Sequence, residues 1–246
     1  MTGVTVLKCP AAGPVLATVE QSCDVLIADE ARIPGSVQDL ATFRQWMHSN
    51  EFPQRGLIAY LQDCIWVDMS PEELFTHNRV RAAFTAAIGG LLQQTELGEF
   101  AGSYVRWSNI NAGVSTEPDG MFYTWDMLRS GRLKYVEGLH GGIMELEGAL
   151  DMALEIVSAT SVNKDTVRLR DLYWRAGVTE YWLVDVRANA LKFEILRHTP
   201  TGYVAVTAQD GWLTSAVFGR AFQLTRRNDP EGNPKYKLES REANQA

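Results

Sequence analysis

The chain has 246 residues, 46% hydrophobic and 22% charged, which suits one large domain or two small ones and excludes a disordered or fibrous protein. Its longest apolar runs are far shorter than the about 20 residues that a membrane-spanning helix needs, so no membrane partner is expected. The net charge of −7 excludes a protein that coats nucleic acid through its overall charge. Residues 1–160 hold 10 Lys/Arg and 20 Asp/Glu whereas residues 161–246 hold 13 and 10, so nucleic-acid contacts would be local and mostly in the second part.

The beginning of the chain predicts an arm, a helix and a hairpin. Residues 1–36 are loosely patterned, and their short valine-rich runs favour edge strands in an N-terminal arm. Apolar residues then recur at helix spacing over 37–49. Two apolar runs at 56–61 and 64–69 are separated by only two residues, which predicts a β-hairpin.

The clearest helix start lies at residues 70–73. Ser70 suits the capping position, Pro71 fits the first turn, and Glu73 completes a capping box, so the pattern predicts a helix from 71 to about 94. His77 lies four residues after Glu73 on the same face of that helix. A surface pair or a cap contact is the simpler interpretation of these two residues, and an accessory role at a site is the alternative.

Three strand-like segments follow, at 103–108, 118–123 and 152–157. The long, glycine-punctuated stretch 124–150 separates the last two, which should be neighbours in a sheet. We therefore predict that this stretch is an insertion formed by a short helix and a hairpin.

The remaining pattern predicts a helix, more strands and a tail. Residues 166–176 are typical of a helix, with Gly177 as its C-terminal cap. The sequence turns polar after Arg226, so residues 227–246 are predicted to form a mobile tail. The last strands are predicted at 181–186, 191–197 and 202–208.

Two acidic residues are candidates for chemistry. Asp119 lies in a Pro-Asp-Gly sequence, for which a turn is the simpler interpretation. Glu155 lies inside a strand that looks buried, where a carboxylate costs several kcal/mol unless a cation or hydrogen-bond donors meet it. A salt bridge to an arginine of the following helix and a metal-ligand role both remain open for Glu155.

Basic residues near the start of the helix predicted at 166–176 are candidates to assist. Asp165 is well placed to begin that helix, and Lys164 lies just before it or in its first turn. A cation is unfavourable there for the helix dipole, so a local partner for Lys164 is expected, although a solvated lysine remains open. Arg168, four residues on, is a stand-in on the same face.

The sequence also lacks several familiar signatures. It has no Gly-rich phosphate loop, no serine nucleophile elbow and no Cys/His cluster, which removes the common nucleotide-binding, serine-hydrolase and zinc interpretations. It has three cysteines, an odd number, and they are not spaced like the cysteines of a metal site. With no export signal, they predict reduced thiols in a cytoplasmic protein.

Several blocks together resemble a known family. Residues 117–120, 154–158, 172–178 and 180–185, with 68–71 and 77–78 before them, look like the Uma-two family of bacterial restriction-endonuclease-like proteins in the PD-(D/E)XK nuclease superfamily. The resemblance covers 37–226 and implies a single α/β domain there. The implied core is a helix, three strands, a helix and a strand around a mixed central sheet, with extra C-terminal strands. The element order predicted from residue 71 onward agrees with it.

The resemblance implies a Mg²⁺-dependent phosphodiesterase. Asp119 and Glu155 would be the metal ligands, with Mn²⁺ as a substitute metal, and a lysine would orient the attacking water or stabilise charge. The implied substrate is nucleic acid, DNA being the expected one. Exposed strand edges also favour a homodimer, which could cut two strands.

The lysine positions depart from the superfamily pattern. The position two after Glu155 is Val157, and the alternative position in the following helix is Leu169. Lys164 is the nearest lysine, and Arg168 is no equal replacement because arginine hardly gives up a proton. A metal-dependent endonuclease assisted by Lys164 is therefore our first hypothesis, and a catalytically inactive binding or assembly module of the same fold is the alternative.

Overall fold

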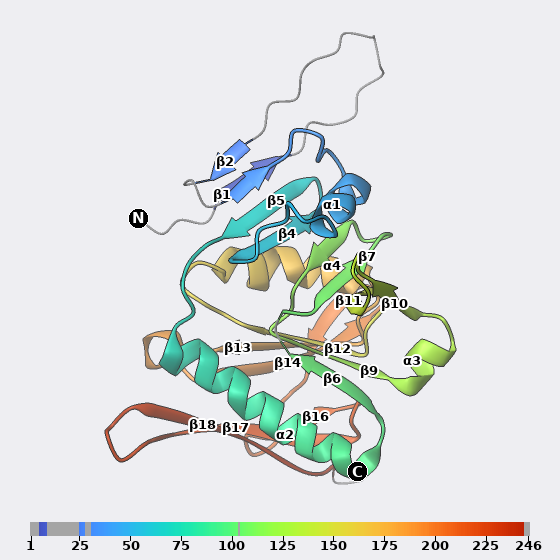
Figure 1. Cartoon of the computed structure of the whole chain (residues 1–246). Helices are drawn as coiled ribbons and strands as arrows, with labels where there is room; N and C mark the ends of the chain where they lie inside the picture. Colours follow the sequence, from blue (N-terminus) through green and yellow to red (C-terminus); the bar gives the residue numbers. More distant parts are fainter. Residues whose placement is uncertain (1–4, 9–24, 28–30, 103, 244–246) are drawn as a thin grey trace.

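The computed structural model describes residues 5–8, 25–27, 31–102 and 104–243 (Figure 1). Two large sheets dominate it, one of seven strands and one of six, and a three-stranded C-terminal sheet packs nearby. Two of the cysteines lie outside the described residues, and Cys64 is a half-buried free thiol. None of the helices described is both long and apolar enough to span a bilayer.

The six-stranded sheet is mixed, as predicted. Its order is β15-β14-β13-β12-β9-β6, in which β12 and β13 run parallel and all other neighbours run antiparallel. Its strands are β6 (Gly98–Gly102), β9 (Gly120–Thr124), β12 (Met152–Ile156), β13 (Glu180–Asp185), β14 (Lys192–Thr199) and β15 (Gly202–Ala205).

Helices cover both faces of this sheet. The π-helical turn η1 (Leu74–Asn78) leads into α2 (Arg79–Thr95), which packs on one face, whereas η2 (Lys164–Leu169) and α4 (Arg170–Arg175) cover the other. Alternate side chains of β12 point to opposite faces, so Leu154 packs toward α2 and Ala153 toward α4. Gly177 ends α4 with a φ of +75°, as predicted. The core order is therefore helix, three strands, helix, strand.

The first strand of that core is not the predicted one. The segment 103–108 was expected to fill this place, but β6 does so, and β7 (Arg106–Asn109) belongs to the other large sheet. Trp107 explains the difference because its fully buried ring packs against Tyr173, 5.4 Å between centroids, on the side of the sheet that α4 covers. The sequence of β6 has no apolar run that could mark it as a strand.

The seven-stranded sheet contains the predicted hairpin and arm strand. Its order is β1-β5-β4-β8-β7-β11-β10, and the β4–β5 turn has Gln62 and Asp63 at φ +45° and +51°. Strand β1 pairs with β5 at one edge, as predicted for the arm, and two further strands of the arm, β2 (Val25–Ile27) and β3 (Ala31–Ile33), pair with each other. The other strands are β1 (Thr5–Lys8), β4 (Leu57–Leu61), β5 (Cys64–Asp68), β8 (Val114–Thr116), β10 (Leu133–Glu137) and β11 (Ile143–Gly148).

The insertion is also confirmed. It consists of α3 (Trp125–Arg129) and the antiparallel β10–β11 hairpin, and β9 and β12 on its two sides are antiparallel neighbours. Strand β11 also pairs with β7, so the insertion completes the seven-stranded sheet.

The first two predicted helix starts are early by three residues, whereas the helix predicted from 166 begins two residues earlier, at Lys164. Helix α1 (Leu40–Met47) begins after Asp39, whose side chain accepts from the backbone N–H of Thr42 at 2.8 Å in a capping box. The second helix begins at Leu74 rather than Pro71, because the capping carboxylate is that of Glu73, which accepts from the N–H groups of the two residues after Leu74. Ser70 therefore caps nothing.

The predicted C-terminal tail is wrong for most of its length. Strands β16 (Leu213–Ser215), β17 (Arg220–Asn228) and β18 (Pro234–Glu242) form a sheet, with β17 and β18 as a long hairpin beside α2. Alternate residues of the hairpin are buried against α2, which polar residues between them conceal in the sequence. These buried residues are Phe222, Leu224, Tyr236 and Leu238.

Candidate functional site

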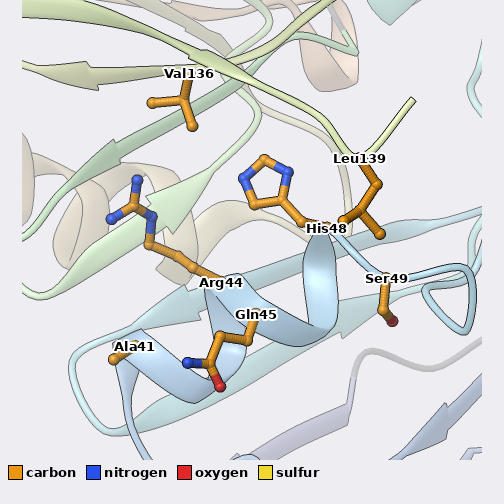
Figure 2. Close-up of a pocket in the computed structure, with 7 residues that line it drawn as sticks. All are labelled: Ala41, Arg44, Gln45, His48, Ser49, Val136 and Leu139. Atoms are coloured by element: carbon orange, nitrogen blue, oxygen red, sulfur yellow. The ribbon is translucent and has the colours of Figure 1, made fainter. Parts of the chain in front are cut away.

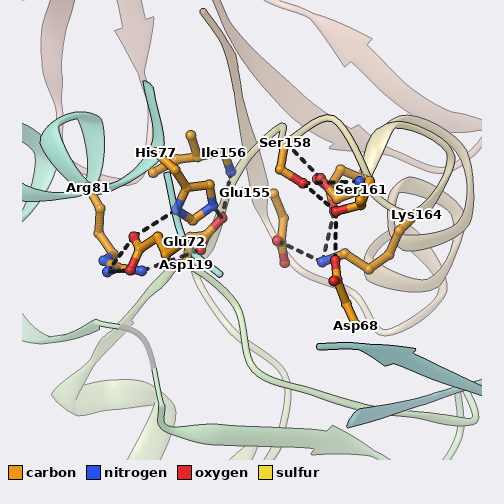
Figure 3. Close-up of polar contacts among 12 residues, drawn as sticks. Asp68, Glu72, His77, Arg81, Asp119, Glu155, Ile156, Ser158, Ser161 and Lys164 are labelled. Atoms are coloured by element: carbon orange, nitrogen blue, oxygen red, sulfur yellow. Dashed lines mark hydrogen bonds and ion pairs between the residues drawn. The ribbon is translucent and has the colours of Figure 1, made fainter. Parts of the chain in front are cut away.

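Strand register brings the two candidate carboxylates together. In the antiparallel β9–β12 pair, Gly120 lies opposite Leu154, so the next position places Asp119 beside Glu155. Asp119 directly precedes β9, and its Oδ2 accepts a hydrogen bond from the backbone N–H of Ile156 at 2.7 Å (Figure 3). The Pro-Asp-Gly sequence for which a turn was predicted forms only a bend before β9, and from this bend Asp119 reaches the end of β12.

Glu155 is buried on the face that η2 and α4 cover. Its carboxylate is 1% exposed, accepts from the Tyr173 hydroxyl at 2.5 Å and lies 3.4 Å from the Lys164 Nζ. Burial raises the pKa of Glu155 to about 8. The negative charges of Asp165 and Asp119 also raise this pKa, whereas the Lys164 ammonium lowers it. The cation that a buried carboxylate requires is a lysine here, rather than the arginine that the sequence suggested.

Lys164 has the local partners that its position requires. Its Nζ lies 2.9 Å from the Asp165 carboxylate and 3.4 Å from Glu155, and the residue is 3% exposed. Burial by itself lowers the pKa of Lys164, but the Asp165, Glu155 and Asp119 charges outweigh it and raise the pKa above its ordinary value. Lys164 is therefore an ammonium ion, which can stabilise negative charge but cannot accept a proton.

Asp165 does not cap a helix. Helix η2 already includes it, its side chain is 1% exposed, and it accepts a hydrogen bond from the Ser161 hydroxyl. The Tyr181 hydroxyl donates to its backbone carbonyl at 2.9 Å. Asp165 thus belongs to the site as the main partner of Lys164, and the signal that could have found it is the adjacent Lys164 and Asp165 at a helix start.

A histidine from η1 reaches Asp119 from the other side. His77 Nε2 lies 3.2 Å from Asp119 Oδ2, and His77 Nδ1 lies 2.9 Å from the Glu72 carboxylate. Arg81 contacts Glu72 at 2.6 Å and lies 3.9 Å from Asp119. Burial lowers the pKa of His77, but the two carboxylates outweigh it and raise the pKa to about 9. His77 is therefore an imidazolium ion at neutral pH that donates to both carboxylates.

The pairing of His77 with Glu73 that the sequence suggested is thus incorrect, because Glu73 caps η1 and its neighbour Glu72 contacts the imidazole. The chain stays extended up to Glu73, which leaves the Glu72 side chain able to reach both His77 and Arg81. No helical spacing links Glu72 to Asp119, so the sequence offered no signal for it.

Arg168 does not join this group. Its guanidinium lies over the Trp66 ring, 5.9 Å from the centroid. Val157 and Leu169, the two positions at which the family pattern expects a lysine, are buried in the apolar core. Lys164 is therefore the lysine that contacts Glu155.

The loop that follows β12 is hydrogen-bonded to the end of β5. The Thr160 hydroxyl donates to Asp68 at 2.7 Å, and Asp68 also accepts from the backbone N–H of Ser70 at 2.9 Å. Ser158 and Ser161 bond each other through backbone and hydroxyl groups. This network, which the sequence pattern did not indicate, ties the loop that carries Ser161 to the seven-stranded sheet.

The donor set at the site suits a hard divalent cation. Mg²⁺ is commonly held by one or two carboxylates and completed by waters and a substrate phosphate. Asp119 and Glu155 supply two carboxylates next to each other, each balanced by a cationic side chain, His77 and Lys164. The part of the chain that the structure describes holds no cluster of three or more His, Cys, Asp or Glu that could bind a metal by protein ligands alone. The residues therefore fit Mg²⁺ and not a site with an all-protein ligand set.

A second charged cluster lies beside a groove of about 450 Å³ between α1 and the β10–β11 hairpin (Figure 2). Arg44 makes two hydrogen bonds to the fully buried Glu145, at 2.9 and 3.0 Å, and one to Glu147 at 2.6 Å. His48 lies 2.9 Å from Glu145. Burial by itself raises the pKa of Glu145, but hydrogen bonds, the strongest of them from Arg44, outweigh burial and lower this pKa. These charges satisfy one another and fasten α1 to β11.

Comparisons with known proteins identify a family for this chain. Residues 40–227 match the family described as "Uma2: Putative restriction endonuclease". A crystal structure titled as "a putative nuclease belonging to DUF820 from Anabaena variabilis" is similar at 15% identity and a TM-score of 0.49, over 65% of this chain and 82% of that one. None of the curated proteins matches the chain. Because the family match covers well over half of the sequence, the chain belongs to the Uma2 family.

Proposed function

We propose that the protein is a Mg²⁺-dependent endonuclease that hydrolyses phosphodiester bonds of nucleic acid, with DNA as the expected substrate. The observation that carries the proposal is the juxtaposition of Asp119 and Glu155 across the β9–β12 pair, with the Lys164 ammonium 3.4 Å from Glu155. Membership of the Uma2 family supports the same reaction class.

Asp119 and Glu155 would hold the metal. When bound, Mg²⁺ activates water and neutralises charge on the phosphate. Binding favours the ionised form of Glu155, whose pKa is about 8 in the free protein. Metal affinity should therefore rise with pH as Glu155 loses its proton.

The other residues have distinct tasks in this proposal. Hydrolysis adds water across a P–O bond and increases negative charge on the phosphate oxygens, which the Lys164 ammonium would stabilise. Asp165 fixes that ammonium, and the Tyr173 hydroxyl orients Glu155. His77 orients Asp119, as hydrogen-bonded partners of metal-binding carboxylates do.

A titration of thermal stability with Mg²⁺ and Mn²⁺ tests the metal site. We expect a rise in melting temperature for the parent and none for Glu155→Gln, which keeps the shape of the side chain but removes its charge. At 100 times the dissociation constant the rise corresponds to about 2.7 kcal/mol. An equal rise in both proteins would place the metal elsewhere. If only the parent's melting temperature rises, cleavage assays on plasmid DNA and on RNA would identify the substrate.

The alternative is a catalytically inactive module of the same fold. The observation that favours it is that Val157 and Leu169 fill the expected lysine positions with core side chains. Lys164→Met separates the two functions. Loss of metal-dependent cleavage, with the metal-induced shift retained, supports the endonuclease, whereas a parent that neither binds metal nor cuts supports the module.

A further inference from the structure

The C-terminal hairpin is basic in an acidic protein. Strand β17 carries three arginines and no acidic residue, and β18 carries three Lys/Arg and two glutamates, although the whole chain has a net charge of −7. Strand β18 lies wholly beyond residue 227, where the family match ends. Neither the proposed metal site nor the family resemblance uses this charge.

Two of these cations face each other without compensation. Arg227 and Lys235 are directly opposite in the β17–β18 register, and both are exposed. Within the described ranges no carboxylate lies within 4.0 Å of either. Like charges opposite each other destabilise an antiparallel pair, so the free protein keeps this pair at a cost that a bound anion would remove.

A cleft of about 430 Å³ lies next to this pair, between the end of the hairpin and the start of α2. We call it the hairpin cleft; its lining includes Asn78, Arg79, Asp229, Lys235 and Tyr236. Arg79 is held in place by Asp229 at 2.9 Å and by the Pro234 carbonyl at 2.7 Å, and its guanidinium lies over the Phe75 ring.

Tyr236 is the buried aromatic residue of the cleft lining. It lines the hairpin cleft and is 6% exposed, and its buried hydroxyl has no hydrogen-bond partner among the residues that the structure describes. The Tyr236 side chain packs on α2, on the side of the hairpin opposite to the exposed Arg227 and Lys235, so the two cations supply the phosphate contacts. Asn78, in the lining of the cleft, directly follows His77 of the candidate site along the chain.

We propose that the hairpin cleft, with Arg227 and Lys235 at its edge, binds a backbone phosphate of the nucleic acid. This inference rests on the proposed nuclease function only for the identity of the polymer. Phosphate contacts position a nucleic acid without reading its sequence, so this surface sets where the polymer lies over Asp119 and Glu155 and leaves base preference unchanged.

The test measures binding without cleavage. Fluorescence anisotropy of a labelled 20-base-pair DNA duplex, in EDTA and at several salt concentrations, compares the parent with Arg227→Gln, Lys235→Gln and the double variant. Lys134→Gln, an exposed lysine on β10, is the matched control. We expect the double variant to bind about tenfold more weakly, with a salt slope smaller by about two, and the control to match the parent.

The melting temperatures of the same proteins provide a second readout. Removing one of two facing like charges should raise the melting temperature of the free protein while it weakens DNA binding. A variant that was merely damaged would lose both. If the double variant does not fold, the two single variants give the same comparison.

The outcomes separate this inference from the nuclease proposal. A parent that binds DNA through these residues and cuts nothing supports the cleft and overturns the nuclease. A parent that cuts DNA while the double variant binds normally overturns the cleft alone. Preferential, variant-sensitive binding of poly-glutamate over the duplex would show an acidic-protein surface and also overturn the proposal.

Discussion

At the scale of single residues, the state of Lys164 depends on its neighbour. The Asp165 carboxylate is its nearest anion, at 2.9 Å against 3.4 Å for Glu155, and none of the three groups is more than 3% exposed. Charges buried this deeply must be paired, because the cost of an uncompensated buried charge is several kcal/mol.

We predict that Asp165→Asn lowers the free energy of unfolding by about 3 kcal/mol, because Lys164 would keep only the longer contact with Glu155. Urea denaturation at pH 7 measures this. Asp171→Asn is the control, since its pair with Arg175 is half exposed on α4 and should matter by less than about 0.5 kcal/mol. Equal effects of the two substitutions would contradict the assignment of Asp165.

His77 should make stability depend on pH. Its pKa rises from 6.5 to about 9 on folding, so the protonated form is stabilised in the folded state. The contribution is fully present below pH 6.5 and is lost as the pH rises through 9, and its maximum is about 3 kcal/mol. Denaturation of the parent and of His77→Gln without metal, from pH 5 to 10, measures the contribution of His77. Glu155 also titrates in this range, but it is present in both proteins and cancels in their difference. A difference between the two proteins that stays constant with pH would refute it.

Residue-level prediction succeeded where the chemistry is local to a strand or a helix start. A glutamate inside an apolar strand marks Glu155, and a lysine at a helix start marks Lys164 as needing a partner. The contacts of Glu72 and Tyr173 depend on how separate elements pack, which a single sequence does not encode in its spacing. The roles of all these residues in catalysis remain predictions.

At the scale of elements, turns were predictable and helix starts were less so. The β4–β5 hairpin and the Gly177 cap depend on a few adjacent residues, and both are present. Two plausible capping residues compete near residue 70, and the Glu73 side chain decides in favour of the later start, because it accepts hydrogen bonds from the backbone N–H groups of Phe75 and Thr76. The β18 strand escaped prediction because its two buried residues are separated by lysine and flanked by charge.

The choice of cap can be tested directly. Glu73→Ala should lower the free energy of unfolding by about 1 kcal/mol, because two backbone N–H groups of η1 lose their acceptor. Ser70→Ala should leave stability within about 0.5 kcal/mol, because the Ser70 hydroxyl makes no hydrogen bond in the structure. Thermal denaturation of both variants is the measurement. The reverse order of effects would restore Ser70 as the cap.

At the scale of the whole molecule, the fold class was predictable because hydrophobic periodicity defines most of the elements and the family resemblance gives their arrangement. The mixed six-stranded sheet with helices on both faces confirms it. The attachment of the C-terminal hairpin was not predictable, since it depends on the apolar face of α2 finding a cover. The homodimer stays a prediction, for light scattering to decide.

Removal of the hairpin strand should therefore unfold more than a tail. Deleting residues 229–246 would expose the apolar face of α2 that Tyr236 and Leu238 cover, and each buried side chain of that size contributes about 1.5–3 kcal/mol. We expect the melting temperature to fall by at least about 5 °C by calorimetry. As a control, deletion of residues 244–246 alone should change nothing. If the longer deletion leaves the melting temperature unchanged, residues 229–246 do not contribute to the core.

The position of Asp119 has a consequence for motion. Residues 117–119 are the crossing between β8 in the seven-stranded sheet and β9 in the six-stranded sheet, and the buried Arg106 pairs with Glu117 at the start of that crossing. Glu155, in contrast, belongs to the six-stranded sheet alone. Glu117 and Asp119, two residues apart, are thus tied to different sheets, so a movement of one sheet against the other would strain the short crossing that ends at Asp119.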